Sequence, residues 1–219
     1  MEFNFKFLHK KNFLNRERVK GLNSKFDDIL LKKSYTALYD NVIQLNSKDI
    51  NGEPMFDNLG KEIKSFFNQQ IDQINLNLDK LWLISSENQH TNPTILPFIP
   101  HFDKRRYFKA MVYLHDVTKR HGPIHLGRTS DSANIEHRRI NLPDNYKLLG
   151  LNTINDFDID GEMIPMVGCA GDIILFDTNT AHKAGIVSKG YMRRVLRFDF
   201  DISTTTTKPS FIRKIFRSF

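Results

Sequence analysis

Apolar residues in the first third of the chain recur at intervals of three and four positions. One imperfect stripe runs through residues 26–45, and a longer one runs through residues 55–78. A turn-forming segment, Asn-Gly-Glu-Pro at residues 51–54, separates the two stripes. Such spacing gives a helix one apolar face, which packs against a core. We therefore expect residues 1–80 to form a helical region that supports the rest of the chain.

From residue 81 onward the apolar runs are short and often alternate with polar residues, as strands do. They lie at residues 81–84, 94–98, 107–114, 122–126, 163–167, 172–176 and 194–202. Short strands of this kind behind N-terminal helices favour an antiparallel sandwich or barrel. We predict a mainly β fold, with a double-stranded β-helix core (jelly-roll, cupin-like) over residues 81–207 and N-terminal supporting α-helices.

The composition of the 219 residues is that of one globular domain, with 40% apolar and 26% charged residues. No apolar run approaches the roughly 20 residues needed to span a bilayer. Lys6, His9, Lys10 and Lys11 interrupt the N-terminal apolar stretch, which therefore does not resemble a secretory signal. The single cysteine, Cys169, excludes an internal disulfide and is typical of a reducing compartment. We expect a cytoplasmic protein without a transmembrane segment.

The net charge of +7 is concentrated at the two ends of the chain. Residues 1–36 hold nine Lys and Arg against four Asp and Glu, and residues 208–219 hold four against none. The body between them is close to neutral, with 19 basic and 21 acidic residues. A nucleic-acid-binding protein usually carries a basic stripe on its folded surface. None is evident, so we expect no nucleic-acid partner. The basic C-terminal tail is compatible with contact to an anionic membrane surface or with a frayed terminus.

The strongest local signal for chemistry is the segment Pro-His-Phe-Asp at residues 100–103. Positions i and i+2 of a strand point to the same side, so His101 and Asp103 can converge on one point. Together they supply two of the three ligands in a 2-His-1-carboxylate iron site. His182, which follows the apolar strand Gly-Asp-Ile-Ile-Leu-Phe-Asp at residues 171–177, is the best candidate for the third. Taken alone, the His-x-Asp pair is equally compatible with a hydrogen-bonded histidine at a strand end.

Four segments in order give the pair its weight: HFD, KAMVYLHDVTKRHGPIHLGRTSD, GDIILFDTNTAHKAG and RRVLRFDF. Over residues 95–202 they resemble the phytanoyl-CoA dioxygenase family of 2-oxoglutarate oxygenases. The resemblance implies that His101, Asp103 and His182 bind Fe(II). It also implies that an arginine about ten residues after the distal histidine binds the co-substrate 2-oxoglutarate. The family usually has a Pro-Gly-Ser-His segment after its Gly-Pro turn, whereas residues 126–131 here read LGRTSD.

Two neighbouring arginines compete for this co-substrate role. A guanidinium suits it, because its planar fork pairs with a carboxylate through two parallel hydrogen bonds. Spacing from the distal histidine favours Arg193. Strand alternation places Arg194 on the apolar face, with Leu196, Phe198 and Phe200. The opposite face holds Arg193, Val195, Arg197 and Asp199. Because a dicarboxylate pocket can be polar inside, alternation does not decide, and we favour Arg193 while Arg194 stays a candidate.

Further candidates lie between the ligands. Tyr107, Lys109, Met111 and Tyr113 alternate along one predicted strand and are candidates to line the pocket, with Lys109 and Tyr113 as co-substrate contacts; packing or surface roles are the alternative. Four more histidines raise the question of a second metal site, although their spacing matches no closed site and exposed loop positions fit them better. These are His115, His121, His125 and His137.

The sequence thus indicates an Fe(II)- and 2-oxoglutarate-dependent dioxygenase that hydroxylates a small organic molecule. The resembling family uses dioxygen and releases succinate and CO2, and ascorbate is a supporting reductant. The alternative is a cupin-type zinc hydrolase, in which the same ligands hold zinc and activate water. The arginines after His182 argue against a hydrolase, which has no need of a dicarboxylate contact there. No residue pattern marks the substrate.

Overall fold

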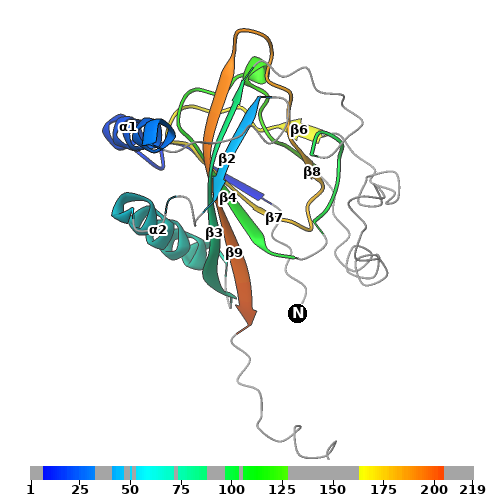
Figure 1. The fold of residues 1–219 in the computed structure, drawn as a ribbon. Coiled ribbons are helices and arrows are strands. Elements are labelled where there is room, and N and C mark those ends of the chain that lie inside the picture. The colour runs from blue at the N-terminus through cyan, green and yellow to red at the C-terminus, as the bar shows by residue number, and fades with distance from the viewer. Residues whose placement is uncertain are drawn as a thin grey trace, which may run out of the picture.

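Two antiparallel sheets form the core of the computed structural model (Figure 1). The structure describes residues 7–32, 41–46, 50, 53–71, 74–87, 97–103, 106–127 and 163–204. The larger sheet has the strand order β1-β7-β4-β9-β3-β2, and the smaller sheet has the order β6-β5-β8. The strands are β1 (Phe7–Lys10), β2 (Val42–Asn46), β3 (Ile74–Glu87), β4 (Phe108–Tyr113), β5 (His125–Gly127), β6 (Met163–Pro165), β7 (Ile173–Asp177), β8 (His182–Lys183) and β9 (Met192–Thr204).

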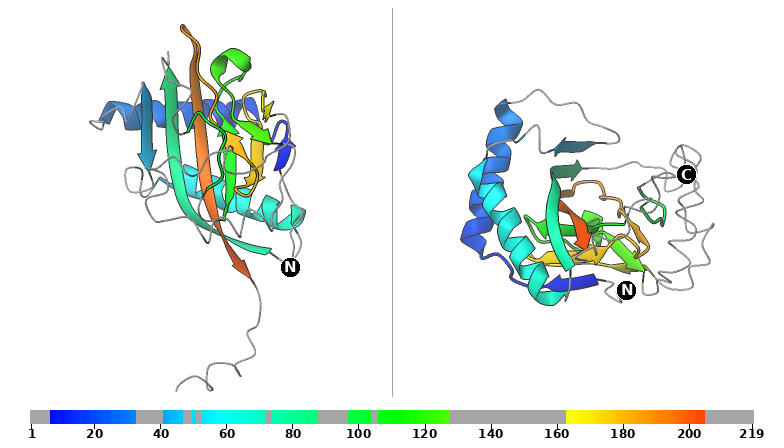
Figure 2. Two further views of the ribbon diagram at one scale, coloured as in Figure 1. Left: turned by 90° about the vertical axis from the view of Figure 1, so that its right-hand side faces the viewer. Right: turned by 90° about the horizontal axis from the view of Figure 1, so that it is seen from below.

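From β4 onward the chain passes back and forth between the two sheets, which is the winding of a double-stranded β-helix. The helices are α1 (Arg16–Lys32), α2 (Pro54–Gln70) and the short 3-10 helix η1 (Lys119–His121). Helices α1 and α2 cover the outer face of the larger sheet, and the smaller sheet faces its inner side (Figures 1 and 2). The predicted mainly β, jelly-roll core with supporting N-terminal helices is confirmed.

Alternation along β9 assigns its two faces to different tasks. Leu196, Phe198 and Phe200 are fully buried in the main apolar core, which the two helices complete. The ring of Phe67, from α2, packs edge-on against that of Phe200 with centroids 5.5 Å apart. Strand β9 also pairs with β3 over most of its length, from Glu87↔Met192 to Ile74↔Thr204. Side chains alternate between the two faces of a strand, so those that lie between the core residues point away from the helices and toward the smaller sheet.

Three parts of the predicted helical region are strands. Residues 7–10 form β1 at one edge of the larger sheet, and residues 42–46 form β2 at the other. Helix α2 ends at Gln70, and residues 74–78 belong to β3. The expected helical stripes were therefore wrong at residues 42–45 and 74–78. Residues 74 and 78 extend the three- and four-residue spacing of α2, so the stripe has no visible end at residue 70. Residues 74, 76 and 78 also alternate with a period of two, which is the pattern of the strand that they form.

Some predictions fall outside the described residues. These are most of the expected strand at 94–98, residues 128–131 of the LGRTSD segment, His137 and the basic tail 208–219. Neither α1 nor α2 has both the length and the apolar character that a bilayer span requires.

The N-terminal arm is tied to the start of β7 by polar contacts. Asp172 accepts hydrogen bonds from His9 Nε2, at 2.9 Å, and from the Asn12 main-chain N–H, also at 2.9 Å. The Leu14 N–H donates to the Gly171 carbonyl oxygen at 2.9 Å. Gly171 has a φ of +90°, and a Cβ there would collide with the Leu14 carbonyl oxygen. The close approach of the arm to β7 therefore requires glycine.

We predict that Gly171→Ala lowers the free energy of unfolding by about 2–5 kcal/mol, because it combines backbone strain with a steric clash. Gly190 is the matched control, since its φ is +82° but a Cβ there meets no atom within 4 Å. Gly190→Ala should cost only the strain, about 1–2 kcal/mol. Urea unfolding of both variants measures the difference, and equal losses would contradict the proposed clash.

Candidate functional site

Two histidines from distant parts of the sequence are joined by a pair of main-chain hydrogen bonds. The His101 N–H donates to the His182 carbonyl oxygen at 3.0 Å, and the His182 N–H donates to the His101 carbonyl oxygen at 2.9 Å. This isolated antiparallel bridge places the two rings side by side, with centroids 4.5 Å apart. Both residues are buried. Main-chain pairing thus positions two imidazoles against each other.

Further hydrogen bonds fix the tautomer of both rings. His101 Nδ1 lies 2.8 Å from the carbonyl oxygen of Ile99, and His182 Nδ1 lies 2.9 Å from that of Thr180. A carbonyl oxygen only accepts, so each Nδ1 carries a proton and each Nε2 has a lone pair. Metal-bound histidines are commonly oriented by such a bond from the second ring nitrogen. Both Nε2 atoms are therefore prepared as metal ligands.

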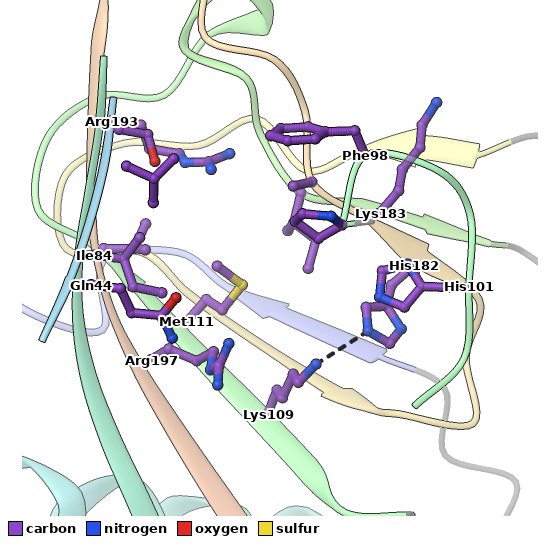
Figure 3. A pocket seen from close by; sticks show the side chains of 16 residues that line it. Gln44, Ile84, Phe98, His101, Lys109, Met111, His182, Lys183, Arg193 and Arg197 are labelled. Carbon is purple, nitrogen blue, oxygen red and sulfur yellow. Dashed lines mark hydrogen bonds between the residues drawn. The ribbon is translucent and has the colours of Figure 1, made fainter. Parts of the chain in front are cut away.

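Asp103 lies beside these rings and is held by Lys109 of β4. Lys109 Nζ lies 2.5 Å from Asp103 Oδ2. The same Nζ lies 3.2 Å from His182 Nε2 (Figure 3). Asp103 Oδ2 is itself 3.6 Å from His182 Nε2. One ligand atom from each of His101, Asp103 and His182 lies within 4.8 Å of the other two. An ion with bonds of about 2.1 Å can reach all three after small side-chain rotations.

Burial and mutual charge keep the three groups in the forms that bind metal. Burial, and secondarily repulsion from His182, lowers the pKa of His101 to about 3. Burial and the Lys109 ammonium also lower the pKa of His182. Burial opposes ionisation of Asp103, but Lys109 and the two histidines outweigh it and hold the pKa of this carboxyl well below its usual value. At neutral pH the site presents two neutral imidazoles and one carboxylate.

This set of donors fits a divalent transition-metal ion. Two imidazole nitrogens and a carboxylate oxygen form the 2-His-1-carboxylate arrangement, which leaves three positions of an octahedral ion open. Within the described part of the chain, no other cluster of at least three His, Cys, Asp or Glu side chains comes as close together.

A cavity of about 110 Å³ opens beside these residues, between the inner faces of the two sheets. One wall comes from β2, β3, β4 and β9, and the other comes from β8 and residues 97–101 (Figure 3). Four cationic side chains line it: Lys109, Lys183, Arg193 and Arg197. No acidic side chain of the described residues is part of the lining. The cavity therefore favours an anionic ligand.

The two neighbouring arginines at the start of β9 point to opposite sides of the sheet. Arg193 is buried and lines the cavity. Arg194 lies on the helix side, where it donates to Asp27 of α1 at 2.7 Å and packs over the Phe26 ring. The candidacy of Arg194 as a co-substrate contact is therefore corrected. Strand alternation turns it toward the face that packs on α1 and away from the cavity.

The two candidates on β4 also differ in position. Lys109 lines the cavity, together with Met111. Tyr113 is fully buried in a second apolar cluster, and its hydroxyl donates to the Met166 carbonyl oxygen at 2.6 Å. Because Tyr113 is not among the described residues that line the cavity, its expected contact with the co-substrate is corrected as well. Its hydroxyl has a structural partner instead.

Arg197 is a cavity residue that motif spacing does not single out. It lines the cavity from β9, and its Nη2 donates to Asp199 Oδ2 at 2.9 Å. The same oxygen accepts a hydrogen bond from the Trp82 indole at 2.8 Å, and the guanidinium lies over the Trp82 ring at 4.9 Å. The available signal was the alternation of polar residues on the face of β9 opposite its phenylalanines.

The other described histidines do not form a metal site. His115 Nε2 accepts a hydrogen bond from the Arg194 main-chain N–H at 2.8 Å, and the rings of His115 and His121 lie 5.2 Å apart. His125 Nδ1 is 3.0 Å from the carbonyl oxygen of Pro123. These side chains therefore have local contacts outside the cavity lining.

No family model matches this sequence, and neither does any curated protein. Solved structures do match in fold. The α-ketoglutarate-dependent epimerase SnoN from nogalamycin biosynthesis has a TM-score of 0.65 and 17% identity over 90% of this chain and 78% of its own. HygX from Streptomyces hygroscopicus, bound to nickel, 2-oxoglutarate and hygromycin B, has a TM-score of 0.59 and 13% identity over 90% and 82%. A Pseudomonas putida prolyl-4-hydroxylase has a TM-score of 0.57 and 13% identity over 90% and 92%. At this identity the likeness shows the fold alone.

We predict that Lys109→Met has opposite effects on the protein with and without metal. Without metal, Asp103 is left as a buried carboxylate without its cation, which should cost about 3–5 kcal/mol of unfolding free energy. With metal, the loss of a competing positive charge should tighten binding of Ni(II) or Mn(II) at least about tenfold. Calorimetric titration and thermal unfolding, each with and without metal, measure the two effects.

Lys183→Met is the control, because it removes the same charge from the lining of the same cavity, whereas Lys109 directly contacts Asp103 and His182. It should change metal affinity much less. Weaker metal binding in Lys109→Met would mean that the lysine supports the ion rather than competing with it.

Proposed function

We propose that this protein is an Fe(II)- and 2-oxoglutarate-dependent dioxygenase, with iron bound by His101, Asp103 and His182. The observation that carries the proposal is the meeting of two neutral imidazoles and one carboxylate at the edge of a cationic cavity. A metal site with three open positions beside a cavity suited to anions fits an ion that binds a dicarboxylate co-substrate. The fold, shared with SnoN and HygX, supports this choice.

With iron and 2-oxoglutarate bound, the site would supply oxidation of a substrate by dioxygen, with release of succinate and CO2. The residues of the chain hold the reactants in place. The hydrogen bonds to Ile99 and Thr180 keep both Nε2 atoms turned toward one point. Lys109 must leave His182 Nε2 when that atom binds metal, because its lone pair cannot serve both. The released ammonium is then free to pair with a carboxylate oxygen of the co-substrate.

Arg193 is our choice for the distal carboxylate of 2-oxoglutarate. It is buried, lines the cavity and follows the distal ligand His182 on the next strand. A buried guanidinium pairs with a carboxylate through charge-assisted hydrogen bonds, which are stronger than neutral ones. We further propose that the substrate is a small organic molecule and that the reaction is a hydroxylation, with ascorbate in a supporting role. Because proteins of this fold also include an epimerase, the type of reaction has to be identified from the product that is formed.

We predict that His101→Ala and His182→Ala abolish binding of Ni(II) and of 2-oxoglutarate in its presence. His125→Ala should bind both normally, because His125 is a histidine of the smaller sheet outside the triad. Calorimetric titration measures binding. Succinate release in the presence of Fe(II), ascorbate and candidate substrates measures turnover.

A wild-type protein that binds neither ligand would refute the oxygenase. Zinc retained after purification without added metal, combined with no affinity for 2-oxoglutarate, would favour the hydrolase.

We predict that Arg193→Gln weakens 2-oxoglutarate binding to the Ni(II) protein roughly 10- to 100-fold, the value of one charge-assisted pair. Arg194→Gln is the matched control: it changes the neighbouring residue but on the other face of β9. Its affinity should stay within about threefold of wild type. Equal weakening in both variants would exclude a specific role for Arg193.

A further inference from the structure

Arg197 is a second cavity arginine, and the co-substrate does not account for it. It lies four residues beyond Arg193 on the same face of β9, and both side chains line the cavity. At about 3.4 Å per residue their Cα atoms are separated by roughly 13 Å. Figure 3 shows the two guanidinium groups apart, with Ile84 and Met111 in the space between them. One carboxylate therefore does not engage both arginines.

The guanidinium of Arg197 is held rigidly from one side. Asp199 Oδ2 accepts a hydrogen bond from Nη2 at 2.9 Å, and the same oxygen is fixed by the Trp82 indole N–H at 2.8 Å. The Trp82 ring lies under the guanidinium at 4.9 Å. Stacking and ion pairing of this kind fix the plane of the fork and reduce the entropy lost when a ligand binds.

The rest of the fork is available to a ligand. A guanidinium has five N–H groups, and Asp199 accepts a hydrogen bond from Nη2 of Arg197. The side chain keeps 21% of its surface accessible, and it lines the cavity. The amide of Gln44 lines the same cavity and adds a neutral donor.

The position of Arg197 relative to the triad suggests what it binds. Arg197 is paired with Met111 across β4 and β9, and both line the cavity with Lys109, two residues before Met111 on β4. Arg197 therefore lies near the end of the cavity where Lys109 contacts Asp103 and His182. The distal carboxylate of 2-oxoglutarate is at the far end of a five-carbon chain and needs a contact away from the metal. Arg193 suits that contact. Arg197 is left for a molecule that binds beside the metal.

We propose that Arg197, held by Asp199 and Trp82, is a specificity-determining residue that binds an anionic group of the primary substrate. The substrate class is therefore a small organic acid, with a carboxylate as the group that best matches the planar fork. This inference rests on the proposed function, since it divides the cavity between co-substrate and substrate. It goes beyond it by naming the chemical class of the substrate.

The test uses matched pairs of probes that differ only in charge: benzoate and benzamide, phenylacetate and phenylacetamide, hexanoate and hexanamide. Each probe is titrated into the full chain saturated with Ni(II) and 2-oxoglutarate, without turnover and at constant ionic strength. Binding is followed by ligand-observed NMR. The wild type should bind at least one carboxylate about tenfold or more tightly than its amide, as expected for a charge-assisted pair.

In Arg197→Gln the preference for carboxylate should fall to within about threefold, while 2-oxoglutarate affinity stays within about threefold of wild type. Arg197→Gln with Asp199→Asn removes both members of the buried ion pair, so it serves if the single variant folds poorly. Arg197→Lys should retain part of the preference, because it keeps the charge without the fork. Arg194→Gln is the control and should behave as wild type.

Three results would overturn the inference. Amides that bind the wild type as well as carboxylates do would show that no anion site exists, and so would a failure of every carboxylate to bind. A loss of 2-oxoglutarate affinity in Arg197→Gln as large as in Arg193→Gln would make Arg197 a co-substrate residue. If the wild type binds neither Ni(II) nor 2-oxoglutarate, the proposed function is refuted, whatever the result for Arg197. Titration of the same probes into the metal-free protein then tests the anion site on its own.

Discussion

The site depends on the antiparallel bridge between His101 and His182. Its two main-chain hydrogen bonds join the segment that carries the His-x-Asp motif to β8, and they leave the two rings side by side. Each ring is then fixed by a bond from Nδ1 to a carbonyl two residues earlier in its own segment. The geometry of the imidazoles is therefore set by the main chain. Side-chain substitutions in the cavity can alter its charge without moving these two ligands.

Strand β9 links the apolar core to the cavity. Its phenylalanines pack on the helices, while Arg193 and Arg197 project between the sheets from the alternate positions. A one-residue slip of β9 against β3 would place the arginines in the apolar core and the phenylalanines in the cavity. The long pairing of β3 with β9 opposes such a slip. Core packing and cavity charge are thus fixed by the same register.

Much of this arrangement could be predicted from the sequence, because its signals are local. The His-x-Asp pair, the apolar strand before His182 and the alternation on β9 each lie within a few residues. The helical expectation for residues 42–45 and 74–78 failed because a short apolar pattern fits both periods, and pairing with distant strands decides between them. Alternation places Arg193 and Arg194 on opposite faces of β9. The sequence does not tell which of these faces borders the cavity, because that depends on where α1 packs.

The contact of Lys109 with both Asp103 and His182 has a consequence for the order of assembly. A buried carboxylate without a cation is costly, so a site that waits for metal must either stay open or supply its own positive charge. Here the ammonium of Lys109 supplies that charge, and β4 holds it in the central part of the larger sheet. The fold can therefore form before an ion is bound. On the proposed function, metal binding would exchange one cation for another, and its affinity would reflect the displacement of Lys109 as well as the strength of the three proposed ligands.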